Sequence, residues 1–304
     1  MALLAARANV SPDSGFPPPH KERTPAPDRG LFADPEKRSL LSIPGIKVVP
    51  LTESIGTVLE NVQLSALTPQ QLDELALLVN ECGVVFFRSQ DLTTEGQVKL
   101  FEHYGELDRH PSQKDTRHHV IRGSTVDHRE ILAYTPWPSG DFHADTSFEI
   151  NPPSYSMLRM EEHPPVGGDT AWVSSYGLYD SLSDAMKALN VNPGFVTGFA
   201  ELKKYEGDKI LDFLNYHIHA ADDHYVRFKW EVGSVALWDN RAVVHRVIPG
   251  SYEAPRRGIR TTVFGEKPYF DSKSEGRLER QKRLKAEKAN GDGVNGADGN
   301  GVGH

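Results

Sequence analysis

Two residues with metal-binding side chains stand two positions apart in the segment GDFHADTSFE: His143 and Asp145. Successive side chains of an extended strand alternate between its two faces, so these two side chains leave the same face. One imidazole and one carboxylate could then reach a single cation. An H-x-D pattern is short, however, and a chain with 13 histidines also produces it by chance. The pair by itself does not decide between a metal site and ordinary polar residues.

A second segment, ALWDNRAVVHRVIPGSYEAPRRGIRTTVFGEKP, supplies further groups. His245 ends an apolar run, and Arg256 and Arg260 follow it. Two imidazoles and one carboxylate that leave other coordination positions open form the facial triad of non-haem Fe(II) oxygenases. Open positions are needed there because the co-substrate and dioxygen both bind to iron. The histidines and the aspartate together therefore predict an iron site.

An arginine near such a site suits a dicarboxylate co-substrate, because its planar guanidinium binds a carboxylate through two parallel hydrogen bonds. In IRTTVFG (259–265), strand alternation places Arg260, Thr262 and Phe264 on one face. Arg260 can therefore point into the protein. An arginine outside such a constellation more often forms a surface salt bridge.

The elements around these motifs indicate a mainly β fold. Short β-rich runs are expected at 46–51, 84–88, 154–160, 169–174, 225–230, 233–239 and 259–265. Thr68, Pro69 and Gln71 have the pattern of a helix start, and further helices are expected at 93–105, 177–189 and 204–218. Many short strands with a few helices favour a β-sandwich or barrel over a doubly wound parallel sheet.

The folded domain is expected at residues 43–272. Residues 1–42 are rich in Pro, Ser, Arg and Asp without sustained periodicity, which predicts a disordered arm. Residues 273–304 begin with a charged stretch that could form a solvated helix and end in a disordered tail rich in Gly and Asn.

The composition excludes several classes of protein. The net charge of -8 argues against a general nucleic-acid or anionic-membrane binder, and no apolar run approaches the roughly 20 residues that span a bilayer. The single cysteine, Cys82, excludes an intramolecular disulfide and a Cys-rich zinc or iron–sulfur site. We therefore expect a cytoplasmic protein that binds a small molecule. The sequence leaves open whether the chain forms a homo-oligomer.

Taken together, the motifs make the chain similar to the taurine/2,4-dichlorophenoxyacetate dioxygenase family of Fe(II)/2-oxoglutarate enzymes. The resemblance runs from about Ile46 to Pro268 and includes, in order, VVFFRSQ, YGELDRHP, FHADTSF, PPVGGDTAWVS, VNPGF, LWDNRAVVH and RRGIRTTVFGEKP. It implies a double-stranded β-helix (jelly-roll) core with flanking helices. It also implies a dioxygenase that uses Fe(II), 2-oxoglutarate and dioxygen to oxidise a C–H bond of a small acidic substrate, namely a sulfonate, carboxylate or amino acid, with release of succinate and carbon dioxide.

The resemblance also assigns roles to individual residues. The residues that match the iron ligands, and hence the catalytic centre, are His143, Asp145 and His245. Arg260 matches the arginine that holds the distal carboxylate of 2-oxoglutarate, with Thr170 as its hydroxyl partner and Arg256 as a second basic residue near the co-substrate. The residues that match the substrate pocket are His110, Phe148 and Phe195.

One feature departs from the family pattern. The interval from His143 to His245 is 102 residues (245 − 143), which is shorter than usual, and the shortfall falls between residues 190 and 191. Either the protein naturally has a smaller pocket, or the sequence lacks a segment because of splicing or gene prediction. Two alternatives to an active dioxygenase follow: an impaired or non-catalytic member that binds metal or ligand without turnover, and a cupin-like metal enzyme that does not use 2-oxoglutarate.

Overall fold

The computed structural model covers most of the expected domain. It describes residues 21–108, 117–122, 142–187, 199, 202–248, 254–269 and 275–294. Within these ranges, no helix combines the length and the apolar character needed to cross a lipid bilayer. Residues 1–20 of the expected arm and 295–304 of the expected tail lie outside the described residues.

In the part of the chain that the structure describes, seven strands form the larger of two sheets, in the order β1-β2-β3-β8-β5-β10-β4. β2 and β3 run parallel, and the other neighbours are antiparallel. The predicted runs 154–160, 233–239 and 259–265 are confirmed as β5, β8 and β10 near its centre. The strands of this sheet are β1 (Lys47–Pro50), β2 (Thr57–Glu60), β3 (Val84–Phe87), β4 (His119–Arg122), β5 (Pro153–Glu162), β8 (Val235–Asp239) and β10 (Arg257–Phe264).

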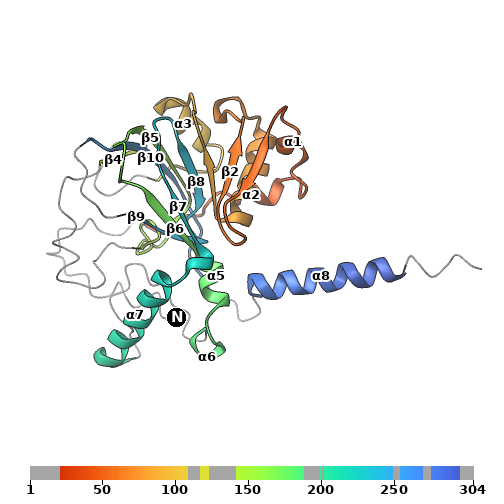
Figure 1. Ribbon diagram of the computed structural model, residues 1–304, viewed down its shortest axis with the longest axis vertical. Helices are drawn as coiled ribbons and strands as arrows, with labels where there is room; N and C mark the ends of the chain where they lie inside the picture. Colours follow the sequence, from red (N-terminus) through yellow and green to blue (C-terminus); the bar gives the residue numbers. More distant parts are fainter. Residues whose placement is uncertain are drawn as a thin grey trace, which may run out of the picture.

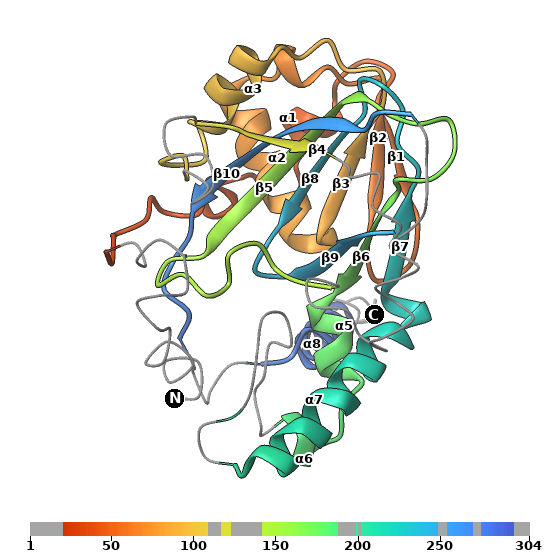
Figure 2. The same cartoon turned by 90° about the vertical axis from the view of Figure 1, so that its left-hand side faces the viewer.

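Three strands form the smaller sheet, in which β6 (Thr170–Ser174) lies between β7 (Tyr225–Phe228) and β9 (Val243–Val247) and is antiparallel to both. Phe86 and Trp238 of the larger sheet contact the ring of Trp172 on β6 in a buried apolar layer. The two facing sheets are seen in Figure 2. They confirm the predicted mainly β architecture.

Strand alternation explains why both faces of the larger sheet are apolar. In β3, Val85 and Phe87 join the core beneath the helices, whereas Val84 and Phe86 join the layer between the sheets. β3 is therefore a continuous apolar run, and its neighbour β8 is apolar up to Asp239, as is expected of strands buried on both faces. Figure 1 shows the resulting layers: helices, larger sheet, smaller sheet.

The main helix of the outer layer, α2 (Pro69–Cys82), begins as predicted. The Thr68 hydroxyl accepts a hydrogen bond from the Gln71 N–H (3.3 Å), and the Gln71 side chain accepts one from the Thr68 N–H (2.9 Å). The helix ends at Gly83, whose φ of +77° carries no steric penalty for glycine, and β3 follows directly. The other helices of this layer are α1 (Arg38–Leu41) and α3 (Thr94–Phe101).

A second group of helices lies beyond the smaller sheet (Figures 1 and 2). The helix predicted at 177–189 is divided into α5 (Ser175–Asp180) and α6 (Asp184–Lys187), and α7 (Lys204–His219) matches the prediction at 204–218. The charged stretch forms α8 (Arg277–Val294), which extends away from the sheets in Figure 1. Short 3-10 helices are η2 (Arg29–Phe32), η3 (Leu64–Ala66) and η4 (Asp222–His224).

Residues 21–42 correct the expectation of a disordered arm that reaches residue 42. Leu40 of α1 is fully buried in the core beneath the larger sheet. The carboxylate of Asp28 accepts hydrogen bonds from the Tyr155 hydroxyl (2.7 Å) and from the guanidinium of Arg241 (2.6 Å). A composition rich in proline and charge predicts disorder, but these contacts join the segment to residues far away in the sequence, which local composition does not reveal.

The substitution Asp28→Asn should destabilise the protein at neutral pH. Burial alone would raise the pKa of Asp28, but Arg241 and Tyr155 outweigh it, so the pKa lies below its usual value. The stabilisation is therefore complete above the unfolded pKa of about 3.9 and is lost as the pH falls through the folded value. Because the carboxylate is partly exposed, we expect the free energy of unfolding to fall by roughly 1–2 kcal/mol near neutral pH.

Urea unfolding followed by circular dichroism measures this difference. It should shrink as the pH falls below about 4, where Asp28 of the unfolded chain becomes protonated, and disappear once the folded carboxylate is protonated as well. A difference that stays the same from neutral to strongly acidic pH would contradict the assignment.

Candidate metal centre

His143 and His245 are held side by side by an antiparallel backbone bridge. The N–H of His143 donates to the carbonyl of His245 (2.9 Å), and the N–H of His245 donates to the carbonyl of His143 (2.8 Å). His245 also belongs to β9, where it pairs with Trp172 of β6. The bridge thus places two rings from distant parts of the chain 4.5 Å apart, measured between centroids.

Asp145 lies outside any regular strand, which corrects the expectation that one extended strand aims both side chains. The chain turns after it: Thr146 has a φ of +39°, uncommon for a β-branched residue, and its carbonyl accepts from the N–H of Glu149 (2.8 Å). The side-chain oxygen of Asn240 accepts from the N–H of Asp145 (2.7 Å), and its amide nitrogen donates to the carbonyl of Asp145 (3.1 Å). Asp145 therefore faces the two histidines from a turn, and the side chain of Asn240 holds this turn in place.

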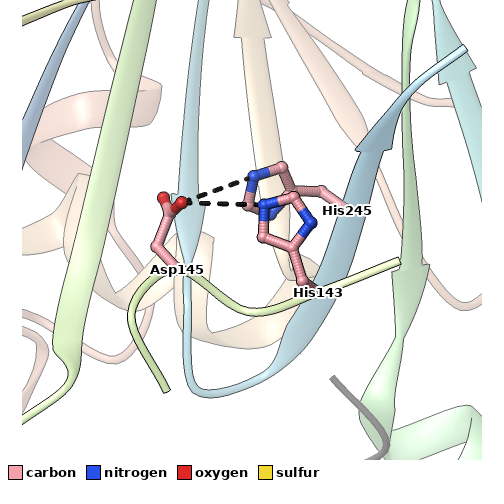
Figure 3. Close-up of side chains that lie close together, drawn as sticks. All are labelled: His143, Asp145 and His245. Atoms are coloured by element: carbon pink, nitrogen blue, oxygen red, sulfur yellow. Dashed lines mark ion pairs between the residues drawn. The ribbon is translucent and has the colours of Figure 1, made fainter. Parts of the chain in front are cut away.

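The three side chains point toward one another (Figure 3). The Oδ1 atom of Asp145 lies 3.8 Å from Nε2 of His245 and 4.0 Å from Nε2 of His143. Bonds of about 2.1 Å place neighbouring ligands of an octahedral ion about 3 Å apart, so movements of about 1 Å bring all three donors onto one cation. Among the described residues, this is the one group of three or more His, Cys, Asp or Glu side chains close enough to hold a metal ion.

The charges of the site suit a divalent cation. Burial by itself raises the pKa of Asp145, but the charges of Arg260 and the two histidines, together with the hydrogen bond from Ser156, outweigh it, and the pKa lies well below its usual range. Burial lowers the pKa of His245 to about 3, although Asp145 opposes the shift. At neutral pH, Asp145 is therefore a carboxylate and His245 a neutral imidazole, which are the forms that bind metal ions. This donor set fits the facial triad that the sequence predicted.

Arg260 points into the site from β10, on the face that strand alternation predicted. Its Nη1 donates to Oδ1 of Asp145, and its Nη2 donates to Nδ1 of His119 on the neighbouring strand β4 (3.1 Å). The other oxygen of Asp145, Oδ2, accepts from the hydroxyl of Ser156 (3.2 Å). Arg260 thus contacts the same oxygen that faces the imidazoles, so a cation bound there competes with the guanidinium.

Thr170 lies beside Arg256, the residue expected as a second basic group near the co-substrate. Nη2 of Arg256 donates to Oγ1 of Thr170 (3.3 Å), and Nε1 of Trp230 donates to the same oxygen (2.9 Å). Nε of Arg256 also donates to the carbonyl of Gly168 (2.8 Å). Arg256 and Arg260 therefore have different partners: Arg256 contacts Gly168 and Thr170, whereas Arg260 contacts Asp145 and His119.

Two tryptophans form an apolar wall behind His245. The ring of Trp238 lies 5.0 Å from the ring of His245, and the ring of Trp172 lies 6.5 Å from it. Both side chains are buried. This wall removes water from the imidazole, which is the main cause of its lowered pKa.

Of the three residues expected to line the substrate pocket, the structure describes only Phe148. His110 and Phe195 lie outside the described residues. Phe148, three positions after Asp145, is 40% exposed. Their proposed contact with a substrate stays a prediction.

Three residues beside Asp145 or Arg260 were not predicted from the sequence: His119, Ser156 and Asn240. No strand was expected at 119–122, so the pairing of His119 with Arg260 could not be inferred. Ser156 and Asn240 are buried polar residues next to apolar runs, a pattern that indicates buried hydrogen bonds. That signal does not reveal which distant residue is the partner.

A cluster of two imidazoles and one carboxylate between two β-sheets defines the class of the protein as a candidate non-haem iron oxygenase. Comparison with known proteins identifies the family. The family described as "Taurine catabolism dioxygenase TauD, TfdA family" matches residues 47–189 and 185–262. The chain belongs to this family, and it is a dioxygenase that depends on Fe(II), 2-oxoglutarate (alpha-ketoglutarate) and dioxygen.

Individual relatives agree with this assignment. A provisionally named alpha-ketoglutarate-dependent sulfonate dioxygenase of Schizosaccharomyces pombe is 31% identical over 83% of this chain and 78% of its own length. The alpha-ketoglutarate-dependent sulfonate dioxygenase of Saccharomyces cerevisiae is 29% identical over 75% of this chain and 69% of its own. A taurine dioxygenase crystal structure from Burkholderia xenovorans matches with a TM-score of 0.62 at 28% identity, over 73% of this chain and 92% of its own. The predicted family and jelly-roll core are confirmed, and the cupin-like alternative without 2-oxoglutarate is set aside.

The same comparisons bear on the short interval between the two histidines. The two family matches meet at residues 185–189, close to the predicted shortening between 190 and 191. The S. pombe alignment extends over 309 positions, but 83% of the 304 residues here is about 252, so about 57 positions (309 − 252) lack a counterpart in this chain. The S. cerevisiae alignment gives the same difference, 285 positions against about 228 residues (75% of 304).

The substitution Arg260→Met should destabilise the metal-free protein and strengthen metal binding. Without Arg260, the buried Asp145 lacks its cationic partner, and breaking a buried ion pair in this way costs about 3–5 kcal/mol. A divalent cation restores the missing positive charge and no longer competes with a guanidinium. We expect a lower melting temperature without metal and a larger stabilisation by Mn(II) than in the wild type, both measured by differential scanning fluorimetry.

Arg159→Met provides a matched control. Arg159 has a similar side-chain exposure (10%, against 11% for Arg260) and pairs with Glu161, but it contacts Gln97 of α3 on the opposite face of the larger sheet. This variant should melt earlier without a larger response to Mn(II). Equal Mn(II) responses in all three proteins would contradict the competition between Arg260 and the cation.

Proposed function

We propose that this dioxygenase oxidises a C–H bond of a small organic acid, with a sulfonate as the leading substrate class and a carboxylate or amino acid as the alternative. The observation that carries the proposal is Arg260, whose guanidinium lies directly beside the cluster of His143, Asp145 and His245. The two yeast relatives, both named as sulfonate dioxygenases, support a sulfonate. The single cysteine, Cys82, supports a reducing, cytoplasmic location.

In this proposal, His143, Asp145 and His245 hold Fe(II). Bound iron supplies the oxidising chemistry, for which 2-oxoglutarate is consumed and released as succinate and carbon dioxide. Ser156 holds Oδ2 of Asp145, so that Oδ1 faces the metal position. The tryptophan wall behind His245 keeps water away from that side of the site.

We place the distal carboxylate of 2-oxoglutarate at Arg256 and Thr170, so Arg256 takes the role that the family resemblance assigned to Arg260. The Thr170 hydroxyl accepts hydrogen bonds from Arg256 and Trp230 and keeps its own proton to donate to a carboxylate. Trp172 pairs with His245, and Thr170 lies two residues along the strand from Trp172, which corresponds to about 6.6 Å. A five-carbon dicarboxylate fits a separation of this size.

Arg260 then receives the acid group of the primary substrate. When a cation occupies the position facing Oδ1 of Asp145, Nη1 of Arg260 can turn to a sulfonate or carboxylate and bind it through charge-assisted hydrogen bonds. His119 accepts from Nη2 through Nδ1, which holds the guanidinium in place through a neutral nitrogen lone pair. His110, Phe148 and Phe195 are the proposed lining of the rest of this pocket.

A second candidate is a family member that binds metal and ligand but turns over poorly. The observation that favours it is the set of about 57 aligned positions that the relatives have and this chain lacks (309 − 252 for S. pombe). A shorter wall near 185–189 would open the site to water and allow dioxygen to react without oxidation of the substrate. The three proposed ligands lie outside this stretch, so metal binding should persist in either case.

Anaerobic titration followed by exposure to dioxygen distinguishes the two candidates. Fe(II) and 2-oxoglutarate together should give a weak visible absorption band, and dioxygen should then release succinate faster when taurine or another small sulfonate is present. A band without substrate-stimulated succinate supports the impaired member. Protein that gives no band with both ligands present overturns the proposal.

Arg256 and Arg260 should affect different ligands. Arg256→Ala should weaken 2-oxoglutarate binding by about 10- to 100-fold, because a charge-assisted hydrogen bond contributes about 1.5–3 kcal/mol. Thr170→Val should act in the same direction with a smaller loss. Arg260→Ala should instead raise the KM for the acidic substrate. Anaerobic calorimetry measures the first effect and steady-state kinetics the second, and the opposite pattern would return Arg260 to the distal-carboxylate position.

A further inference from the structure

We infer that Asn240 is a positioning residue for Asp145, an inference that rests on the proposed metal site. Asn240 lies between β8 and β9 and is 3% exposed. Its Oδ1 accepts from the N–H of Asp145 (2.7 Å), and its Nδ2 donates to the carbonyls of Asp145 and Pro153 (3.1 Å each). The amide oxygen and both amide protons of Asn240 are therefore engaged.

Asp145 needs such a partner because none of the strands that the structure describes pairs with it. The backbone bridge holds His143 against His245, and the chain then turns at Thr146 with its positive φ. A buried backbone N–H and C=O must still be hydrogen-bonded. A side-chain amide presents the same donor and acceptor groups as a peptide unit, so Asn240 supplies Asp145 with the two bonds that a neighbouring strand would otherwise provide.

Asn240 is itself held from the other side. Its backbone N–H donates to the carbonyl of Ser154 in β5 (2.8 Å), next to the Pro153 carbonyl that its side chain binds. From Asn240 the chain continues into β9, which carries His245 five residues after Asn240. Asn240 therefore connects the carboxylate and one imidazole of the proposed site through a single short segment. Its removal should change where Asp145 lies relative to His245.

Asn151 offers a matched comparison within the same chain. It is also 3% exposed. Its Oδ1 accepts from the N–H of Arg23 (2.9 Å), and its Nδ2 donates to the carbonyls of Arg23 (3.1 Å) and Gly265 (3.0 Å). The two asparagines thus make the same three kinds of hydrogen bond, but only Asn240 bonds to a proposed metal ligand.

Titration of the full-length chain with Co(II) alone, followed by visible absorption, tests the inference without measuring activity. Asn240→Ala should raise the Kd for Co(II) by about 10- to 100-fold, as removal of groups that orient metal ligands typically does. Asn151→Ala should leave this Kd little changed. Both variants should lower the urea midpoint by similar amounts, so stability alone cannot account for the difference.

Asn240→Ser, a smaller truncation with the same expected direction, replaces Asn240→Ala if the latter does not fold. A folded Asn240 variant that binds Co(II) as tightly as the wild type overturns the inference. Failure of both Asn240 variants to fold, while Asn151→Ala folds, also overturns it, because the role would then be structural. Wild-type protein that does not bind Co(II) overturns the proposed metal site instead.

Discussion

A carboxylate buried between two β-sheets stays charged only if positive charge and hydrogen-bond donors surround it. Asp145 meets this requirement through the guanidinium of Arg260 and the hydroxyl of Ser156, which both donate to its carboxylate. A divalent cation bound between Asp145 and the two imidazoles satisfies the same requirement. The arrangement that stabilises the metal-free protein is therefore also the one that prepares the site for metal.

The two faces of the larger sheet have different roles: one packs against helices, and the other faces the proposed metal site. Its outer face packs against α1, α2 and α3 in an apolar core. Its inner face carries Trp238, Ser156 and Arg260 toward the smaller sheet, which contributes His245 and Thr170. Because successive residues of a strand face opposite ways, one short strand can serve both purposes.

Arg260 on β10 and Arg256 in the loop before it contact different groups, which suits different roles in the proposed site. Arg256 is fixed by Gly168 and Thr170, whereas Arg260 reaches Asp145 and His119. None of these partners is shared between the two arginines. Two acids at opposite ends of the site, one from the co-substrate and one from the substrate, suit two separated cations.

The sequence by itself determined the features that depend on local residue order. These are the ligand types around His143 and His245, the inward direction of Arg260, the helix start at Thr68 and the family motifs. Tertiary structure alone decided which side chains meet. It paired Thr170 with Arg256, brought His119 and Asn240 to the site, replaced the expected strand at Asp145 by a turn, and packed residues 21–42 onto the domain. The reason is that contacts between distant segments depend on strand register and turn geometry, and a shift of one residue in register reverses the face that every side chain occupies.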